Sequence, residues 1–118
     1  TDYPTNDGTA VRDYLHVSDL ADAHLKALEA LPDYQGILTC NLGTGKGSSV
    51  LEVIHAFEEI SGITIPYELS GRRTGDVTEA WADPSMAEQV LGWKAKYNLN
   101  EMLADAWNWQ QKNPNGYD

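Results

Sequence analysis

Short extended segments alternate with amphipathic helices along this chain, and this alternation constrains its fold more than any other feature. The extended stretches are residues 11–17, 37–42 and 63–69. The second is predicted to be a buried strand, and the third an edge or irregular strand because of Pro66. Strands that alternate with helices predict an α/β fold with parallel pairing. Parallel sheets are covered on both faces, and three strands are few for that arrangement, so the chain is expected to be a portion of a larger fold.

Start and stop signals predict four helices. Ser18 is the expected N-cap of the first helix, and Pro32 and Gly36 bracket its exit. The other signals are two capping boxes, a proline at a first helical position and a terminal glycine: Ser49 with Glu52, Asn98 with Glu101, Asp83 before Pro84, and Gly62.

The formal net charge of −10 limits the partners that this chain can have. Nucleic acids and anionic membranes attract basic surfaces, so neither is an expected partner, and the charge is interpreted as a contribution to solubility. The single cysteine, Cys40, permits no internal disulfide, and its apolar flanks favour a buried structural thiol. The 118 residues contain no apolar run that could span a membrane, and the first residues have no signal-peptide pattern. We therefore expect one cytoplasmic domain at most.

The three arginines stand at two places in the sequence. Arg12 lies in the first extended segment, whereas Arg72 and Arg73 follow a glycine and precede Asp76. Guanidinium groups bind phosphate in a bidentate manner, so Arg12 and Arg73 could together neutralise a diphosphate. Asp76 could then accept hydrogen bonds from two ribose hydroxyls. Surface salt bridges are the alternative, because eighteen Asp and Glu residues offer partners, and the residues alone favour neither interpretation.

Three other patterns have simpler interpretations. The loop G-T-G-K-G at residues 43–47 follows a predicted strand, but a phosphate-binding loop needs Ser or Thr after Lys46, and a dinucleotide motif needs glycine where Ser48 stands. We interpret it as a plain strand-to-helix connection. The histidines have no metal-ligand spacing, so no metal site is predicted. Tryptophan side chains predict core or subunit packing at three positions: Trp93, Trp107 and Trp109.

The order of several segments makes the sequence recognisable. They are D-Y-P-T-N-D-G-T-A-V-R-D-Y-L-H-V-S-D, C-N-L-G-T-G-K-G-S-S-V-L-E-V, R-R-T-G-D, W-A-D-P-S-M-A-E-Q-V-L-G-W and N-W-Q-Q-K-N-P-N-G-Y. Over its whole length the chain closely resembles the C-terminal part of the UDP-glucose 4-epimerases, a family of extended short-chain dehydrogenases/reductases. The R-D-Y and N-L-G segments are shared widely among nucleotide-sugar enzymes of that superfamily. The first and last segments are more specific to the epimerases.

This resemblance implies an enzyme of two domains. An N-terminal Rossmann domain would hold NAD permanently, and a Y-x-x-x-K motif would remove the proton from the sugar 4-hydroxyl while hydride passes from C4 to NAD. The 4-keto sugar would then turn and take the hydride back on its other face. Neither a G-x-x-G-x-x-G nor a Y-x-x-x-K motif occurs in this chain. Residues 1–118 are therefore expected to be the UDP-sugar-binding domain, with no catalytic or cofactor-binding residue.

The resemblance implies a site that binds UDP. It places Arg12 and Arg73 on the phosphates, Asp76 on the ribose and Val50 against the uracil. Tyr14 is expected beside the arginines on the same strand face. Binding energy would then be concentrated on the nucleotide, remote from the carbon that reacts, so that the sugar can turn.

The resemblance also places Ala80 in the sugar pocket, where some family members carry a tyrosine. A methyl side chain leaves space for an N-acetyl group, so the expected ligands are UDP-glucose, UDP-galactose and UDP-N-acetylhexosamines. The complete enzyme is expected to be a homodimer. Three alternatives stay open: another nucleotide-sugar epimerase or dehydratase of the superfamily, a non-catalytic module that binds nucleotide sugars, and a structural domain whose tryptophans serve only packing.

Overall fold

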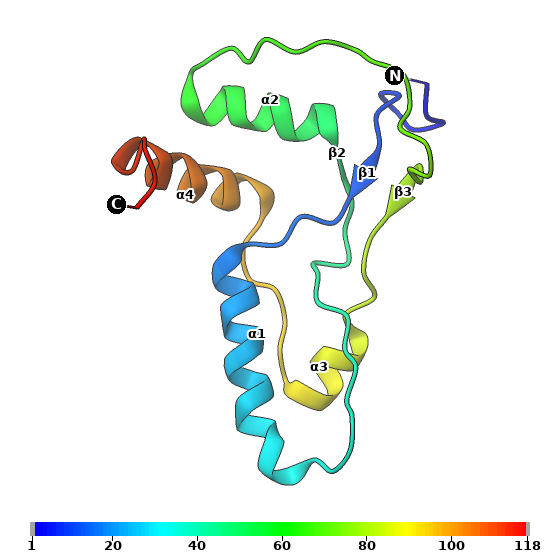
Figure 1. The fold of residues 1–118 in the computed structure, drawn as a ribbon, viewed down its shortest axis with the longest axis vertical. Helices are drawn as coiled ribbons and strands as arrows, with labels where there is room; N and C mark the ends of the chain where they lie inside the picture. The colour runs from blue at the N-terminus through cyan, green and yellow to red at the C-terminus, as the bar shows by residue number, and fades with distance from the viewer. Residues whose placement is uncertain (1, 118) are drawn as a thin grey trace.

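The protein, described by a computed structural model over residues 2–117, is a mixed α/β chain whose helices are joined by long connections (Figure 1). The α/β fold class is confirmed. In chain order the elements are β1 (Val11–Arg12), α1 (Val17–Ala30), the 3₁₀ turn η1 (Leu31–Asp33), β2 (Ser48–Ser49), α2 (Val50–Ser61), β3 (Glu79–Ala80), α3 (Ser85–Leu91) and α4 (Leu99–Lys112).

The three strands form one small sheet in the order β2-β1-β3. Val11 pairs with Glu79 in a parallel ladder and with Ser49 in an antiparallel one. Parallel pairing was predicted among residues 11–17, 37–42 and 63–69, whereas the observed ladders join β1 to β2 and β3, which were not predicted as strands, and only the ladder with β3 is parallel. The reason lies in the path of the chain: β1 continues down into α1, and residues 36–47 return alongside, so that β2 arrives in the opposite direction (Figure 1).

The strands predicted over residues 37–42 and 63–69 do not form in the described structure. Both stretches are extended connections, and Ile37 is 92% exposed. A β-strand needs a neighbouring strand edge to accept and donate its backbone hydrogen bonds. No strand of residues 2–117 pairs with either stretch, so their apolar, β-branched composition was not sufficient to make them strands.

Most predicted helix boundaries are confirmed. Capping boxes open both α2 and α4, and Gly62 ends α2 in the left-handed conformation, with φ of 69°. The N-cap of α1 is His16, not Ser18 as predicted, because the His16 Nδ1 atom accepts the Ser18 N–H at 2.9 Å. Residue 84 is likewise the N-cap of α3 and not its first helical residue, one position later than predicted.

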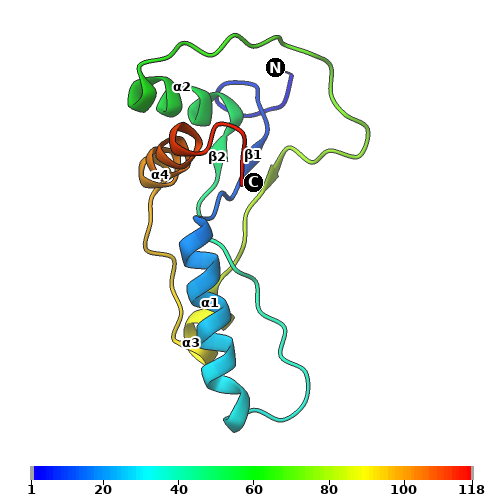
Figure 2. The ribbon, with the colours of Figure 1, turned by 60° about the vertical axis from the view of Figure 1, so that its left-hand side comes forward.

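The helices pack in two pairs, α1 with α3 and α2 with α4, which lie at opposite ends of the molecule (Figures 1 and 2). The buried core of the first pair consists of Ala23, Ala87 and Trp93, so the prediction of core packing is confirmed for Trp93. Cys40 packs half-buried against this cluster. Trp107 meets Phe57 edge to face between α2 and α4, with ring centroids 5.4 Å apart.

Much of the apolar surface is left uncovered by residues 2–117. The radius of gyration is 17.1 Å, whereas a compact domain of this length has about 13–14 Å. On α1, Leu25 and Leu28 are 58% and 62% exposed. Chains with one well-buried core seldom leave so many large aliphatic side chains in water.

Residues 2–117 lack two kinds of feature. Within residues 2–117 no helix has both the length and the apolar character needed to cross a membrane. The same residues contain no group of three or more His, Cys, Asp or Glu side chains placed to hold a metal ion.

Candidate functional site

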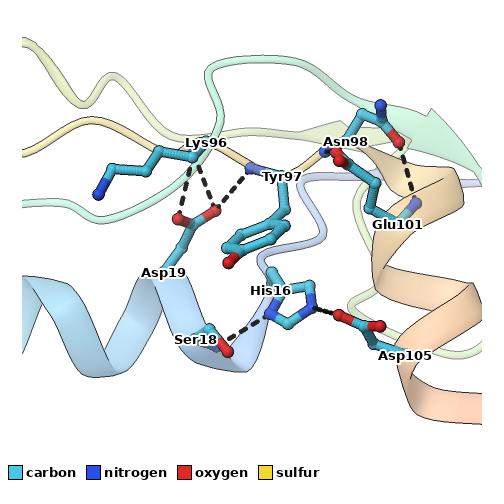
Figure 3. A network of polar contacts seen from close by, with 8 residues as sticks. All are labelled: His16, Ser18, Asp19, Lys96, Tyr97, Asn98, Glu101 and Asp105. Atoms are coloured by element: carbon cyan, nitrogen blue, oxygen red, sulfur yellow. Dashed lines mark hydrogen bonds and ion pairs between the residues drawn. The ribbon is translucent and has the colours of Figure 1, made fainter. Parts of the chain in front are cut away.

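A polar network at the start of α1 joins the two helix pairs (Figure 3). His16 is 5% exposed, and its Nε2 atom lies 3.0 Å from the Asp105 carboxylate on α4. Since Nδ1 accepts the Ser18 N–H, the neutral ring carries its proton on Nε2 and donates it to Asp105. The Tyr97 ring stacks on the imidazole at 4.3 Å between centroids. One side chain thus caps α1 and holds α4.

Asp19, in the first turn of α1, fixes the connection between α3 and α4 (Figure 3). Its carboxylate is 1% exposed and accepts the backbone N–H groups of Lys96 and Tyr97 at 3.0–3.1 Å. The Trp93 ring N–H donates to the Asp19 carbonyl at 3.0 Å. A carboxylate that accepts several backbone N–H groups can stay buried, because these bonds replace those to water.

Asp13 plays the same part for the glycine loop. Its carboxylate accepts the N–H groups of Thr44, Gly45 and Ala82 at 3.0–3.2 Å, and the Thr44 hydroxyl at 2.6 Å. A Cβ at Gly43 would lie 2.4 Å from this carboxylate, which explains the glycine there. The amides of Thr44, Gly45 and Lys46 are thus bonded within the chain, although the strand that was predicted to precede this loop does not form. The amides of Thr44 and Gly45 are therefore not available to the pyrophosphate of NAD.

Sequence reasoning did not single out Asp13, His16 or Asp19. All three lie in one segment, R-D-Y-L-H-V-S-D, and each bonds to residues more than thirty positions away. The spacing of the segment signalled a strand followed by a helix, and it carried no information about these distant partners.

A cleft of about 390 Å³ lies between the start of α2, the N-terminal segment and residues 67–76. This volume is in the range of small-molecule sites. Val50, Leu51 and Ile54 supply an apolar wall, and Arg73 and Asp76 supply opposite charges. The structure therefore brings Val50 together with Arg73 and Asp76, which lie more than twenty positions further along the sequence. Their roles in binding stay a prediction.

The two arginines of the predicted UDP-binding site differ in their surroundings. Arg12 is engaged within the protein: its guanidinium pairs with Asp76 at 2.5 Å and donates to the carbonyls of Val11 and Val77 at 2.7 and 2.8 Å. The salt-bridge alternative is thus realised for this residue. Arg73 lines the cleft, and its guanidinium has no hydrogen bond or ion pair with any residue of 2–117. Arg73 is therefore the arginine with its charge available to an anion.

Tyr3 and Arg72, which sequence reasoning did not assign to the site, complete the surroundings of Asp76. The Tyr3 hydroxyl donates to Asp76 Oδ2 at 3.0 Å, and the Arg72 guanidinium lies 4.2 Å above the Tyr3 ring centre. The bond from Tyr3, with the pairing to Arg12, holds the pKa of Asp76 below its usual value. Burial and the neighbouring Asp76 raise the pKa of Tyr3. Asp76 is accordingly an ionised acceptor, and Tyr3 a neutral donor, at neutral pH.

The other two predicted site residues lie elsewhere. Tyr14 lines a hollow of about 370 Å³ between the glycine loop and the start of α4, and not the cleft. The expected shared strand face fails because β1 ends at Arg12, so strand alternation does not extend to residue 14. Ala80 is exposed and pairs with Arg12 across the β1–β3 ladder. The neighbouring Trp81 ring lies against Gly47 and is 54% exposed.

Comparisons with known proteins identify the family of this chain. Residues 2–106 match the family model described as GDP-mannose 4,6 dehydratase. The UDP-glucose 4-epimerase of Bacillus subtilis is 55% identical over 116 residues, which are 98% of this chain and 34% of that protein. The chain therefore spans about a third of the length of the curated relatives that it matches.

Solved structures give the same result at the level of the fold. UDP-glucose 4-epimerase from Bifidobacterium longum, in complex with NAD+ and UDP, superimposes with a TM-score of 0.92 at 52% identity, covering 98% of this chain and 34% of that one. The UDP-Glc/GlcNAc 4-epimerase from Campylobacter jejuni does so with a TM-score of 0.83 at 38% identity, covering 94% and 34%. The chain therefore belongs to the GDP-mannose 4,6-dehydratase family, and within that family it resembles the C-terminal part of the UDP-glucose 4-epimerases.

Proposed function

We propose that this chain is the UDP-sugar-binding part of an epimerase that interconverts UDP-glucose and UDP-galactose. The observation that carries the proposal is the cleft, in which an arginine with an available charge, Arg73, lies near an ionised carboxylate, Asp76, and an apolar wall. A nucleoside diphosphate needs these three surfaces: a cation for the phosphates, an acceptor for the ribose and an apolar face for the base. Relatives crystallised with UDP or UDP-glucose support the assignment.

The chain's own residues would bind and orient the nucleotide. Arg73 would pair with the diphosphate, with Arg12 beside it, Asp76 would accept the ribose hydroxyls, and Val50 would contact the uracil. None of these residues would touch the sugar carbon that reacts. Binding energy placed on such a remote group holds the substrate while the sugar keeps its freedom to turn.

The reaction itself would take place with the help of residues outside this chain. We propose that NAD and the base are held by a Rossmann domain N-terminal to residues 1–118, in a complete enzyme that is a cytoplasmic homodimer. The uncovered apolar side chains on α1 and at Ile37 support such a larger fold, as does the share of the relatives that the chain spans. The glycine loop of this chain does not offer the amides of Thr44 and Gly45 to NAD, because both donate to Asp13.

The chain alone is expected neither to bind NAD nor to convert UDP-galactose into UDP-glucose. Residues 1–118 contain no glycine fingerprint and no Y-x-x-x-K motif. The measurement is a coupled assay for UDP-glucose formation, together with an NAD fluorescence titration, with the complete enzyme as the positive control. Turnover by the isolated chain above a matched blank would contradict the proposal that NAD and the catalytic base are held by residues outside this chain. A complete enzyme without epimerase activity that still binds UDP-sugars would instead favour a binding module.

Ala80 is expected to let the complete enzyme accept UDP-N-acetylglucosamine as well as UDP-glucose. A methyl side chain leaves open the space that a tyrosine ring would take, and Ala80 is exposed beside Arg12 in the sheet. A steric wall rejects a substrate strongly, whereas its removal adds little direct affinity, so use of both sugars is expected rather than a switch. A relative with 38% identity is described as a Glc/GlcNAc 4-epimerase.

The measurement is kcat/KM for both sugars in the parent and in Ala80→Tyr. The tyrosine variant should keep its activity on UDP-glucose and lose most of its activity on the N-acetyl sugar. The control is Ala21→Tyr, which introduces the same ring at an exposed position on α1, away from the cleft. Ala104→Tyr would be unsuitable, because residue 104 is half-buried on α4 and the ring could disturb the packing there. Rejection of the N-acetyl sugar by the parent, or equal use of it by Ala80→Tyr, would refute the assignment of Ala80.

A further inference from the structure

We propose that Tyr3 is a positioning residue for the cleft, which orients the Asp76 carboxylate toward the ribose of a bound uridine nucleotide and is itself locked in place by Arg72. This inference rests on the proposed function and deepens it. It assigns to the N-terminal segment a part in nucleotide recognition, although that segment is more than sixty residues from the R-R-T-G-D segment in the sequence.

The two oxygens of Asp76 are held by two different donors. Oδ1 accepts from Arg12 at 2.5 Å, and Oδ2 accepts from the Tyr3 hydroxyl at 3.0 Å. A carboxylate offers about four acceptor positions, so two bonds leave roughly two for a ligand. Because each oxygen is anchored by a different donor, the carboxylate cannot rotate freely. Its remaining lone pairs therefore face a fixed direction, as recognition of two adjacent hydroxyls requires.

Tyr3 is itself held in place by Arg72. The Arg72 guanidinium stacks 4.2 Å from the centre of its ring, and Arg72 Nε donates to Asp2 Oδ1 at 2.9 Å. A further bond runs from the same guanidinium to the Asp2 carbonyl. Arg72 thus binds the backbone and the side chains of the N-terminal segment at once. Although it is next to Arg73, it serves the geometry of the site, and Arg73 retains the available charge.

Direct contact with the ligand is not the main role of the Tyr3 hydroxyl. A phenol has a single O–H to donate, and in this structure it is donated to Asp76. The same bond is the main cause of the lowered pKa of Asp76. Tyr3 therefore also favours the ionised carboxylate, which is the acceptor that ribose hydroxyls need. Loss of the hydroxyl should therefore weaken binding through Asp76 and through no other group.

The experiment compares UDP with 2′-deoxy-UDP by calorimetric titration of the complete enzyme. Tyr3→Phe keeps the ring beneath Arg72 and removes only the donor. It should weaken UDP binding about three- to tenfold, the effect of one lost hydrogen bond, and weaken 2′-deoxy-UDP binding less. The preference for UDP over the deoxy ligand should therefore shrink. Tyr34→Phe makes the same chemical change on an exposed tyrosine far from the cleft and should leave both affinities unchanged.

A second variant makes the result independent of any general effect on the fold. If Tyr3 acts through Asp76, Tyr3→Phe should add no further loss to Asp76→Asn, and the double variant should bind UDP as the single one does. Additive losses, or equal weakening of both ligands by Tyr3→Phe, would overturn the role of Tyr3. A different outcome would contradict the proposed function itself. If the parent does not prefer UDP over 2′-deoxy-UDP, and Asp76→Asn binds UDP as the parent does, Asp76 does not contact the ribose and the proposed use of the cleft is wrong.

Discussion

Replacing Arg73 with alanine in the complete enzyme is expected to weaken UDP binding by about ten- to a hundredfold, the effect of losing a charge-assisted hydrogen bond. Arg73 lines the cleft and has no ion pair with any residue of 2–117. Its removal therefore breaks no hydrogen bond or ion pair among these residues, and the melting temperature should stay within a degree or two of the parent. Calorimetric titration with UDP and thermal denaturation measure the two quantities.

Arg12→Ala should weaken UDP binding by a similar factor, and unlike Arg73→Ala it should also lower stability. Its guanidinium joins β1 to Asp76 and to the carbonyl of Val77, so the variant releases the segment that carries the acceptor. Asp76→Asn should cost less affinity than either arginine variant, since an amide oxygen still accepts from one hydroxyl.

The matched control is Lys112→Ala, which removes one positive charge at the end of α4 and should leave UDP affinity unchanged. Unchanged affinity in both arginine variants would make these residues ordinary salt-bridge partners. An equal loss in Lys112→Ala would mean that the net charge of the protein, and not the cleft, attracts the nucleotide.

Trp93→Ala is expected to lower the free energy of unfolding by about 3–5 kcal/mol, the usual cost of removing a buried aromatic side chain. Trp93 is 1% exposed, and it packs with Ala23 and Ala87 between α1 and α3. The variant leaves a cavity in the one fully buried cluster of the described residues. It also removes the donor to the Asp19 carbonyl, next to the carboxylate that holds the connection into α4.

Urea denaturation of the complete enzyme, followed by circular dichroism, measures this loss through the transition that reports the α1–α3 pair. The control is Trp109→Ala, since Trp109 is 40% exposed and packs edge to face on Tyr117. It should cost about 1 kcal/mol, as a partly exposed side chain does. Equal losses in the two variants would show that Trp93 is not the centre of the core.

The sequence predicted the helices better than the strands, and the reason is the range of the interactions. The capping boxes of α2 and α4 are bonds between residues three positions apart, so they can be read from the sequence alone. The segment 37–42 has strand composition, yet a strand exists only where a second edge completes its hydrogen bonds. Nothing local indicates whether such an edge is present, and among residues 2–117 it is not.

The N-cap of α1 shows a different limit. Serine is a favoured residue type for an N-cap, but α1 begins two residues earlier than predicted, and the His16 ring acts as the cap by accepting the Ser18 backbone N–H. Histidine is an uncommon cap, and it can serve here because Asp105 and Tyr97, about ninety and eighty residues away, hold the ring in place. A preference derived from residue types cannot include that support.

For the site, the sequence by itself determined the chemistry: two arginine segments, a carboxylate near one of them, the helix start at Val50 and the family to which they belong. Only the tertiary structure decided which of these groups meet. It engaged Arg12 with Asp76, left the charge of Arg73 available, placed Tyr14 outside the cleft and brought Tyr3 and Arg72 to the carboxylate. The physical reason is that side-chain chemistry belongs to each residue, whereas hydrogen bonds between segments more than sixty residues apart depend on the path of the whole chain.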